Sequence, residues 1–465
     1  MDRRPRVAVI GAGISGLTAA YSLRRALGDD VHLDVFARDD RPGGALRTRT
    51  VGGTSVDVGA EAFIVRRAEA RDLITELGLA DQIVSPGIMR PAVWSGGALH
   101  RLPSPALMGI PAESSAMRGL LDDAGLERLA TEPRRRLDWV RGAEPTVGGL
   151  VADRFGDEVV ARAVDPMLGG VYSARARDLG LREAIPALAA ALDDGAPSLT
   201  AAVQDVVGRA TGSGPVFGAL RGGYRTLVDA LVEASRSVVH IGVTVDSVEP
   251  AGRGYELVAD WTGDLRYDAV LVAAPVWRAA DLLAAAAPRA ANAFGAVDAA
   301  GSAVVAFAVD PDSPLPEYSG VLAATDSGLS VKAITLSSRK WPHLAASRGA
   351  DGRPSTLRTS VGRLGEPVIA DDAELVRRAG ADLATVFGAA GLPEPDVLDA
   401  VVQRWPEGLP HYGPGHLAAM ADATAALPNG LAVAGSGYRG VGVPACIGTA
   451  RDAASRIVAH LHQNT

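Results

Sequence analysis

Cysteine and lysine are the two residue types that this chain largely lacks. Cys446 is the only cysteine among 465 residues. One cysteine excludes an intramolecular disulfide, a thiolate zinc site and an iron–sulfur cluster, so we expect no metal centre. Lys332 and Lys340 are the only lysines, so arginine carries nearly all the positive charge. Arginine stays charged when partly buried and binds carboxylates with two parallel hydrogen bonds.

Positive net charge and long apolar runs are also absent. The net charge of −8 argues against nucleic-acid binding. The apolar run over residues 268–287 is broken by Pro275, Arg278 and Asp281, so we expect no transmembrane span. A strand predicted from Arg6 leaves no room for a signal peptide, and the cytoplasm is the expected location. The length predicts two or three domains.

Glycine, in contrast, forms a recognisable pattern near the start of the chain. A β-type run over Arg6–Ile10 leads into Gly11, Gly13 and Gly16, and an alanine-rich helical pattern follows over Ile14–Leu27. In a dinucleotide-binding βαβ unit these glycines permit a tight turn, backbone approach to a pyrophosphate and packing of helix on strand, in that order. The helix amides then face the anion. We therefore expect the cofactor to contact Gly11, Ala12, Gly13, Ile14, Ser15 and Gly16.

Two further glycine segments favour a flavin nucleotide over a tight turn without a ligand. Gly43–Gly44 follow the second predicted strand, Val31–Phe36, as in flavoproteins of the amine-oxidase and phytoene-desaturase type. Glycines let the backbone approach a ligand without a clash at Cβ. Residues 437–446 form a second glycine loop, in which Pro444 suits the start of a helix. The positive end of that helix would stabilise reduced flavin at its N1–C2=O edge.

Because nucleotide-type segments occur at the start, middle and end, we expect a discontinuous domain. The predicted fold class is α/β. A Rossmann-like FAD-binding domain is expected to comprise residues 1–82, 215–284 and 403–465. A mostly helical insertion is expected over residues 83–214, and a substrate-binding α+β domain over residues 285–402.

Nine segments carry a more specific signature, and they lie at residues 9–16, 40–44, 57–63, 108–111, 154–160, 165–172, 340–343, 404–412 and 440–447. On these segments the chain resembles, over nearly its full length, the bacterial coproporphyrinogen III oxidases and protoporphyrinogen IX oxidases of haem synthesis. The first two segments occur in many flavin oxidases, whereas the later ones are typical of the porphyrinogen branch. The resemblance to the Gram-positive-type coproporphyrinogen oxidases is the strongest.

The resemblance implies non-covalent FAD and an oxidation carried out by the flavin. Hydride would pass from the methylene bridges of coproporphyrinogen III to flavin N5, and O2 would accept the electrons. Three rounds would remove six electrons and yield coproporphyrin III and three H2O2. No essential general base is implied. Beyond the first loop, the resemblance places the cofactor against Ala37, Arg38, Gly43, Gly44, Ala45, Gly59, Ala60, Glu61, Ala62, Val245, Trp405, Gly440, Val441, Gly442 and Val443.

One position departs from the family pattern. The family ends its second strand with an acidic residue that holds the adenosine ribose, and this chain has Ala37 there. Asp34, Arg38, Asp39 and Asp40 lie nearby in the sequence. A substitute contact, a bridging water and weaker FAD binding all remain open. One lost charge-assisted hydrogen bond is worth roughly 1.5–3 kcal/mol at most, so the other contacts could still hold FAD.

The substrate carries propionates, so arginines are expected in its pocket. The candidates are Arg66, Arg67, Tyr172, Arg339, Lys340 and His411. Each has a plainer alternative: a solvated surface position for the cations, a core position for Tyr172 and a structural hydrogen bond for His411. Trp405 is equally open between flavin contact and core.

Other functions remain as alternatives. Protoporphyrinogen IX oxidation is the second choice, and an oxidase of amines or polyenes is a further one. A non-catalytic binding protein on the same fold, as in the Rab GDP-dissociation inhibitors, is the non-enzyme alternative, against which the intact loop at residues 440–444 argues. Peripheral membrane contact and contact with a downstream haem-pathway enzyme stay open.

Overall fold

The computed structural model describes residues 4–209, 214–347 and 352–463. A five-stranded parallel sheet organises the nucleotide-type segments, in the order β12-β2-β1-β16-β22. Its strands are β1 (Arg6–Ile10), β2 (His32–Ala37), β12 (Val238–Ile241), β16 (Ala269–Val272) and β22 (Leu431–Val433). The predicted α/β class is confirmed, and the sheet draws its strands from the start, middle and end of the chain.

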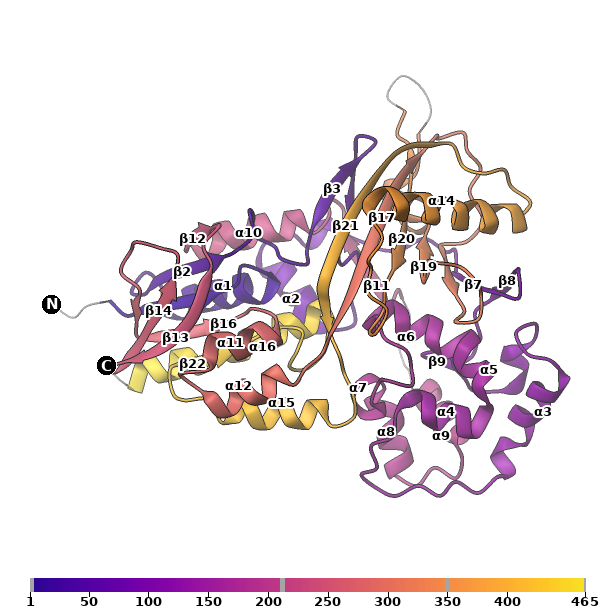
Figure 1. Cartoon of the computed structure of the whole chain (residues 1–465), viewed down its shortest axis with the longest axis horizontal. Helices are drawn as coiled ribbons and strands as arrows, with labels where there is room; N and C mark the ends of the chain where they lie inside the picture. The colour runs from indigo at the N-terminus through magenta and orange to yellow at the C-terminus, as the bar shows by residue number, and fades with distance from the viewer. Residues whose placement is uncertain (1–3, 210–213, 348–351, 464–465) are drawn as a thin grey trace.

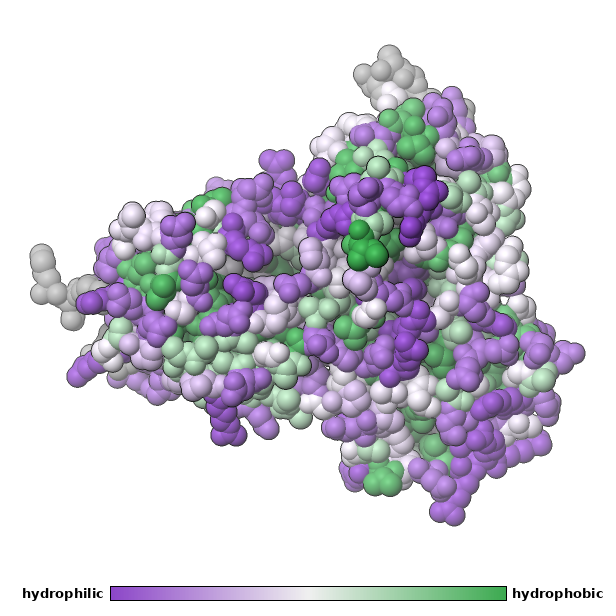
Figure 2. Space-filling model, viewed as in Figure 1, coloured by the Kyte–Doolittle hydropathy of each residue, from purple (hydrophilic) through white to green (hydrophobic). Residues whose placement is uncertain are grey.

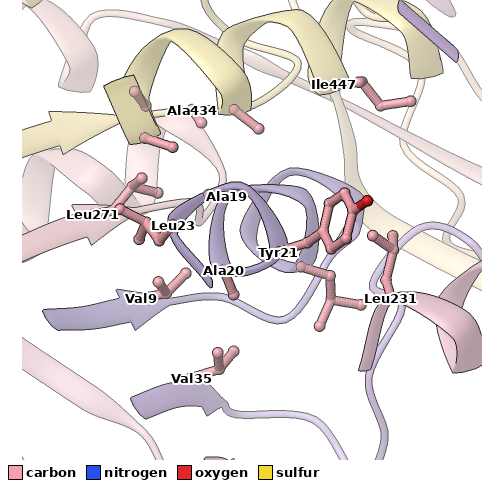
Figure 3. Close-up of a cluster of buried hydrophobic side chains, with 14 of the residues drawn as sticks. Val9, Ala19, Ala20, Tyr21, Leu23, Val35, Leu231, Leu271, Ala434 and Ile447 are labelled. Atoms are coloured by element: carbon pink, nitrogen blue, oxygen red, sulfur yellow. The ribbon is translucent and has the colours of Figure 1, made fainter. Parts of the chain in front are cut away.

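Helices cover one face of this sheet. They are α1 (Ile14–Leu27), α2 (Ala68–Glu76), α10 (Arg225–Ser235) and α16 (Val443–Gln463). The predicted bounds of α1 are confirmed at both ends. Figure 3 shows Ala19, Tyr21 and Leu23 of this helix between the sheet and its neighbours, with Ile447 on α16 and Leu231 on α10. This packing brings the first and last helices side by side.

The other face of the sheet carries a smaller antiparallel sheet and three helices. The sheet consists of β13 (Val245–Ala251), β14 (Gly254–Ala259) and β15 (Arg266–Tyr267). The helices are α11 (Val276–Leu283), α12 (Pro288–Gly295) and α15 (His416–Ala425). Their apolar side chains form one buried cluster with the sheet residues of this face. The nucleotide lobe therefore has three layers.

A seven-stranded sheet forms the second lobe, in the order β21-β17-β20-β19-β18-β7-β8. Its strands are β7 (Ala92–Ser95), β8 (Ala98–Arg101), β17 (Ala299–Val309), β18 (Gly320–Ala323), β19 (Ala333–Thr335), β20 (Ser355–Val361) and β21 (Val397–Pro410). Helix α14 (Asp372–Ala389) packs on one face through a buried apolar cluster, and the β3–β4 hairpin (Thr48–Val51 and Thr54–Asp57) lies against the other. The long strands β17 and β21 lead toward the nucleotide lobe (Figure 1).

The third part is a helical lobe below the seven-stranded sheet (Figure 1). Its helices are α3 (Asp123–Thr131), α4 (Val147–Phe155), α5 (Asp157–Val159), a π-helix at Val160–Val164, α6 (Asp165–Tyr172), α7 (Leu181–Ala184), α8 (Pro186–Asp193) and α9 (Leu199–Arg209). A buried ion pair supports it: Arg154 donates to Glu132 at 2.8 Å, and Glu132 also accepts from the first amides of α9. Arg154, part of a signature segment, thus serves the fold.

Short elements connect these parts. They are β5 (Phe63–Ile64), β6 (Ile83–Val84), β9 (Ala106–Leu107), β10 (Ile110–Pro111), β11 (Phe217–Leu220), α13 (Ser337–Lys340) and the single turns Ala80–Gln82, Ser114–Met117, Glu132–Arg134 and Pro342–Leu344. Strand β11 pairs with both β5 and β6, and so joins the segment after the helical lobe to the nucleotide lobe.

The strand pairing crosses the domain boundaries expected from the sequence. Strands β7 and β8 fall within the predicted helical insertion, yet β7 pairs in parallel with β18 of the seven-stranded sheet. Strand β21 spans the boundary predicted between residues 402 and 403, because it pairs along its length with β17. Helix α12, expected in the substrate-binding domain, packs on α11 and α15 in the nucleotide lobe. These shifts arise from pairings between residues far apart in the sequence.

The visible surface is mixed in character. Figure 2 shows hydrophilic residues over much of this face, with apolar residues in small groups between them. Within the described residues, no helix combines the length and apolarity needed to cross a bilayer.

Candidate functional site

The glycine loop after β1 contains two kinds of glycine. Gly11 has φ +109°, and a Cβ there would lie 2.6 Å from the Ala273 carbonyl oxygen. A Cβ on Gly16 would lie 1.8 Å from the Gly11 carbonyl oxygen. Gly13 differs, because a Cβ there would meet nothing within 4 Å. The protein's own packing therefore requires Gly11 and Gly16, whereas Gly13 borders open space that a ligand can fill.

The Gly-Gly pair is joined directly to this loop. Gly43 pairs with Gly13, and its amide donates to the Ala12 carbonyl at 2.7 Å. Gly44 has φ +55°, and a Cβ there would lie 3.2 Å from the Gly13 Cα. The two segments thus form one backbone cradle, defined here as residues 11–16 and 43–44. Bare backbone around open space fits the diphosphate of a flavin nucleotide.

Arg41 holds the cradle in place, and sequence reasoning missed this residue. Its guanidinium donates to the carbonyls of Pro42 at 2.8 Å, Gly44 at 3.0 Å and Leu46 at 3.1 Å. Burial lowers the pKa of Arg41, although arginine remains charged. A cation half-buried under the cradle also favours an anion above it. The signal available in the sequence was an arginine directly before a Pro-Gly-Gly turn.

Two helix N-termini reach this edge of the parallel sheet. Helix α1 begins at Ile14 with no acidic residue in its first turn, and α16 begins at Val443. The buried Cys446 of α16 lies within hydrogen-bonding distance of Ser15 on α1. Both helices therefore direct positive ends toward one region, which suits a negatively charged cofactor. Burial raises the pKa of the Cys446 thiol to about 11, so this cysteine is a poor nucleophile.

The loop before α16 is fixed by a buried tyrosine. Tyr412 accepts a hydrogen bond from the Gly440 amide at 2.7 Å and donates to the Ser436 carbonyl at 2.6 Å. Gly440 has φ +133°, which a larger residue would adopt only with strain. Residues Val441 and Gly442 follow directly and lead into Val443 at the start of α16. Tyr412 thus links a loop expected to contact flavin to the signature segment 404–412.

At the end of β2, where the adenosine ribose is expected, no carboxylate of the strand is free to replace the missing acidic residue. Ala37 is buried at the end of the strand, and its carbonyl accepts from the Val243 amide at 3.0 Å. Asp34 is engaged elsewhere: it bonds to His240 at 2.8 Å and to the Tyr267 hydroxyl at 2.9 Å. Although burial opposes it, these bonds hold the pKa of Asp34 below its usual value. Arg38, Asp39 and Asp40 are exposed beside Ala37, and Val245 is buried at the start of β13.

The segment expected beside the flavin ring is anchored by Trp405. The indole N–H donates to the Val58 carbonyl at 3.1 Å. A Cβ on Gly59 would lie 3.2 Å from the Trp405 ring and 1.9 Å from the Ala45 carbonyl oxygen. Trp405 therefore packs on Gly59 at the start of this segment, and its contact with the flavin stays a prediction.

Glu61 and Lys340 pair with each other in this region. The Lys340 ammonium lies 2.6 Å from the Glu61 carboxylate, and Ser337 donates to the same carboxylate at 3.1 Å. Burial alone would raise the pKa of Glu61, but Lys340 and Arg358 lower it to about 2. Lys340 also lies 5.0 Å from the centre of the Trp341 ring. The predicted propionate ligand Lys340 is therefore already neutralised by a predicted cofactor residue, Glu61.

Arg358 of β20 is a second residue that sequence reasoning missed. Its guanidinium donates to the Asp57 carbonyl and lies 3.9 Å from Glu61. Burial raises the pKa of Asp57 to about 6, although Thr48 and the Tyr224 amide donate to its carboxylate. A single arginine in an otherwise uncharged strand was the signal for a specific buried partner.

The remaining substrate candidates do not converge. Arg66 and Arg67 are exposed before α2, where Arg67 pairs with Glu69 at 2.7 Å. Arg339 donates to the Leu315 carbonyl at 2.9 Å, and His411 contacts the Asp178 carbonyl at 2.7 Å. Tyr172 lies at the end of α6, with its ring centre 5.9 Å from that of Tyr412. Lys340 contacts a predicted cofactor residue, Glu61, and Tyr172 contacts Tyr412, which holds Gly440.

Comparison with known proteins decides the family. The model of the flavin-containing amine oxidoreductases matches residues 14–458. The chain belongs to this family. The expected flavin cofactor is thereby confirmed, and FAD is the nucleotide that the cradle suits.

Named relatives within this flavin-containing family lie on the porphyrinogen branch. The coproporphyrinogen III oxidase of Mycobacterium tuberculosis (strain H37Rv) is 48% identical and covers 97% of this chain and 96% of its own. The human protoporphyrinogen oxidase is 28% identical over 97% of this chain and 98% of its own. A structure from Exiguobacterium sp. 255-15, provisionally named a protoporphyrinogen oxidase, superposes with a TM-score of 0.84 at 26% identity and 99% coverage of both chains. The resemblance deduced from the motifs is confirmed.

Proposed function

We propose that the protein oxidises coproporphyrinogen III to coproporphyrin III, with non-covalently bound FAD as cofactor and O2 as acceptor. The observation that carries the substrate is the 48% identity, over 97% of the chain, to a protein named coproporphyrinogen III oxidase. The backbone cradle and the two converging helix N-termini support the cofactor. Bound FAD would supply hydride acceptance from the substrate's methylene bridges and electron transfer to O2.

The chain's own residues supply binding and placement. The cradle and the N-termini of α1 and α16 would hold the diphosphate, with Arg41 fixing the Gly43–Gly44 turn from below. Trp405 would hold residues 59–62 against the ring-binding region. The Lys340 ammonium pairs there with the Glu61 carboxylate, and Lys340 and Arg358 outweigh burial to lower the pKa of Glu61. We assign no residue as a general base.

Turnover of two porphyrinogens tests the substrate. We expect a higher kcat/KM for coproporphyrinogen III than for protoporphyrinogen IX, because four propionates can accept more charge-assisted bonds than two. A preference for protoporphyrinogen IX would instead establish the second candidate function, protoporphyrinogen oxidation, which is the activity in the human relative's name. Porphyrin formation that continues without O2 would overturn the proposed acceptor.

The non-covalent attachment has its own test. Cys446 is buried and its thiol pKa is raised, which makes a flavin thioether at the chain's one cysteine unfavourable. Acid precipitation should therefore release all the flavin into the supernatant, measured by absorbance. Yellow colour retained in the washed precipitate would contradict this. The cytoplasmic location remains a prediction, which fractionation of the producing cells checks.

A further inference from the structure

Three cationic side chains meet where the end of α6 contacts the loop after β20. Lys332 is 5% exposed, and its ammonium donates to the Ser173 hydroxyl at 2.5 Å and to the Gly362 carbonyl at 2.8 Å. Neither acceptor carries a charge. Arg363 follows Gly362 directly, and its guanidinium Nε lies 3.6 Å from where a Cβ on Gly169 would be. The third cation, Arg175, follows α6.

One carboxylate is paired directly with these cations. Glu366 accepts from Arg175 at 2.9 Å and lies 3.5 Å from Arg363. Asp165 is also near, but it already accepts from the Ala176 amide at 2.7 Å and from the Thr325 hydroxyl at 2.7 Å. The group of Lys332, Arg175, Arg363 and Glu366, called the cation cluster below, therefore carries one surplus positive charge when Lys332 is neutral and two when it is protonated. Burying such a surplus is costly unless an anion joins it.

The pKa values of two cations in the cluster reflect this surplus charge. Burial and the neighbouring Arg363 together lower the pKa of Lys332 to about 7, and Glu366 offsets only part of this shift. Burial also lowers the pKa of Arg363, where Glu366 gives partial compensation and Arg175 adds repulsion.

Intervening residues connect the cluster to both segments expected to contact the flavin. Trp405 on β21 pairs with Ser302 on β17, and a Cβ on Gly362 would lie 3.0 Å from the Ser302 Cα. Gly362 is thus about 10 Å from Trp405, the width of two strand spacings. On the other side, Tyr172 precedes Ser173 and packs on Tyr412, which holds the loop at residue 440. Figure 1 shows α6 at the edge of the helical lobe nearest the seven-stranded sheet.

We propose that Arg363, supported by Lys332, receives a propionate carboxylate of the porphyrinogen. This proposal rests on the proposed function, and it identifies the side chain that recognises the negative charge of the substrate. A guanidinium binds a carboxylate with two hydrogen bonds, and the incoming charge balances the surplus. Helix α6 has no side chain at Gly169, where a Cβ would lie 3.6 Å from the Arg363 Nε, or at the exposed Gly170. No α6 side chain at these two positions therefore blocks the approach of a carboxylate.

Binding at this place has a second consequence. A carboxylate near Lys332 favours its protonated form, so an anion bound near pH 7 should bring a proton with it. The groups that face Lys332 are Ser173 after α6 and Gly362, Arg363 and Glu366 on the loop after β20. Arg175 and Asp165 act on Arg363 from the helical lobe. Arg363 remains charged, and hydrogen bonds from Arg175 outweigh burial to lower the pKa of Glu366, which leaves Lys332 as the group that takes up the proton.

The first test is titration of the holoenzyme with coproporphyrin III, the air-stable oxidised porphyrin with the same four propionates, followed by porphyrin fluorescence. Arg363→Gln should weaken binding roughly ten- to a hundred-fold, and Arg363→Lys should weaken it less. Arg377→Gln is the matched control, because Arg377 is exposed on α14 and paired with Glu374. Flavin content and Tm establish that each variant is folded. Wild-type affinity in a folded Arg363→Gln enzyme would overturn the proposal.

The second test measures protons by titration calorimetry in two buffers of different ionisation enthalpy at pH 7.5. We expect the wild type to take up a fraction of a proton on binding coproporphyrin III, and Lys332→Met to take up none. Equal uptake in both proteins would remove Lys332 from the proposal. A wild type that oxidises coproporphyrinogen III while Arg363→Gln binds normally would reject this inference alone, whereas a wild type without that activity would reject the proposed function.

Discussion

The backbone cradle and the cation cluster would both bind negatively charged groups, but they use different parts of the protein to do so. The cradle uses amides and missing side chains, drawn from residues within a few dozen positions of one another. The cluster uses charged side chains, and its Lys332–Ser173 bond joins residues 159 positions apart. Backbone recognition leaves a local glycine pattern in the sequence, whereas side-chain recognition across lobes leaves none. Substitutions in each region should therefore fail in different ways.

The largest effect is expected from Gly13→Val. A Cβ at this position would meet no protein atom within 4 Å, so the fold should persist while the valine side chain excludes FAD. We expect purified protein with nearly all its flavin absorbance lost and a normal far-UV circular dichroism spectrum. Gly380→Val is the matched control, since Gly380 also faces open space but lies on α14. Full flavin occupancy in Gly13→Val would show that the cradle does not bind the diphosphate.

Gly16→Ala should damage the fold itself. Its methyl group would lie 1.8 Å from the Gly11 carbonyl, so the α1–β1 contact must open. Such overpacking costs roughly 1–3 kcal/mol or more. Urea unfolding of the apoprotein should reveal the loss even without FAD, which separates Gly16 from Gly13. An unchanged midpoint would mean that the loop relaxes freely.

Ala37→Glu tests whether the adenosine ribose of FAD lacks a contact with the protein. Asp34 is engaged by His240 and Tyr267, so a new carboxylate at position 37 would not duplicate it. If the ribose bond forms, apoprotein should bind FAD more tightly by up to roughly 1.5–3 kcal/mol. Equal or weaker affinity in a fluorescence titration would mean that Asp39, Asp40 or water already serves the ribose.

Lys332→Met should change the pH dependence of stability. The folded pKa of Lys332 is about 7 and its ordinary value is 10.5, so the unfolded chain binds one more proton between these limits. The free energy of unfolding of the wild type therefore gains a contribution that rises with pH across this window, on the order of 1 kcal/mol per pH unit. Urea unfolding at pH 7.5 and 9 should show a smaller rise in Lys332→Met. Parallel changes in both proteins would contradict a depressed lysine.

Local sequence signals predicted the nucleotide lobe well. The bounds of α1 followed from its glycine start and alanine-rich pattern, and β1 at Arg6–Ile10 was predicted to the residue. The seven-stranded sheet was harder, because the place of β7 depends on pairing Val93 with Leu322. For the same reason arginines were sought next to the flavin segment, at Arg66 and Arg67, and not at Arg363. Its neighbours Gly169 and Arg175 lie in another lobe and far from it in the sequence.

The placement of α16 against α1 sets an order of events for the newly made chain. The five-stranded sheet needs β22, and the cradle's second helix end needs Val443, both of which follow the helical lobe and the seven-stranded sheet along the sequence. Residues 6–44 must therefore wait, with one side of α1 uncovered, until those lobes have been synthesised. Cofactor capture is thereby deferred to the last stage of folding, so flavin incorporation reports that the whole chain has assembled and not merely its first domain.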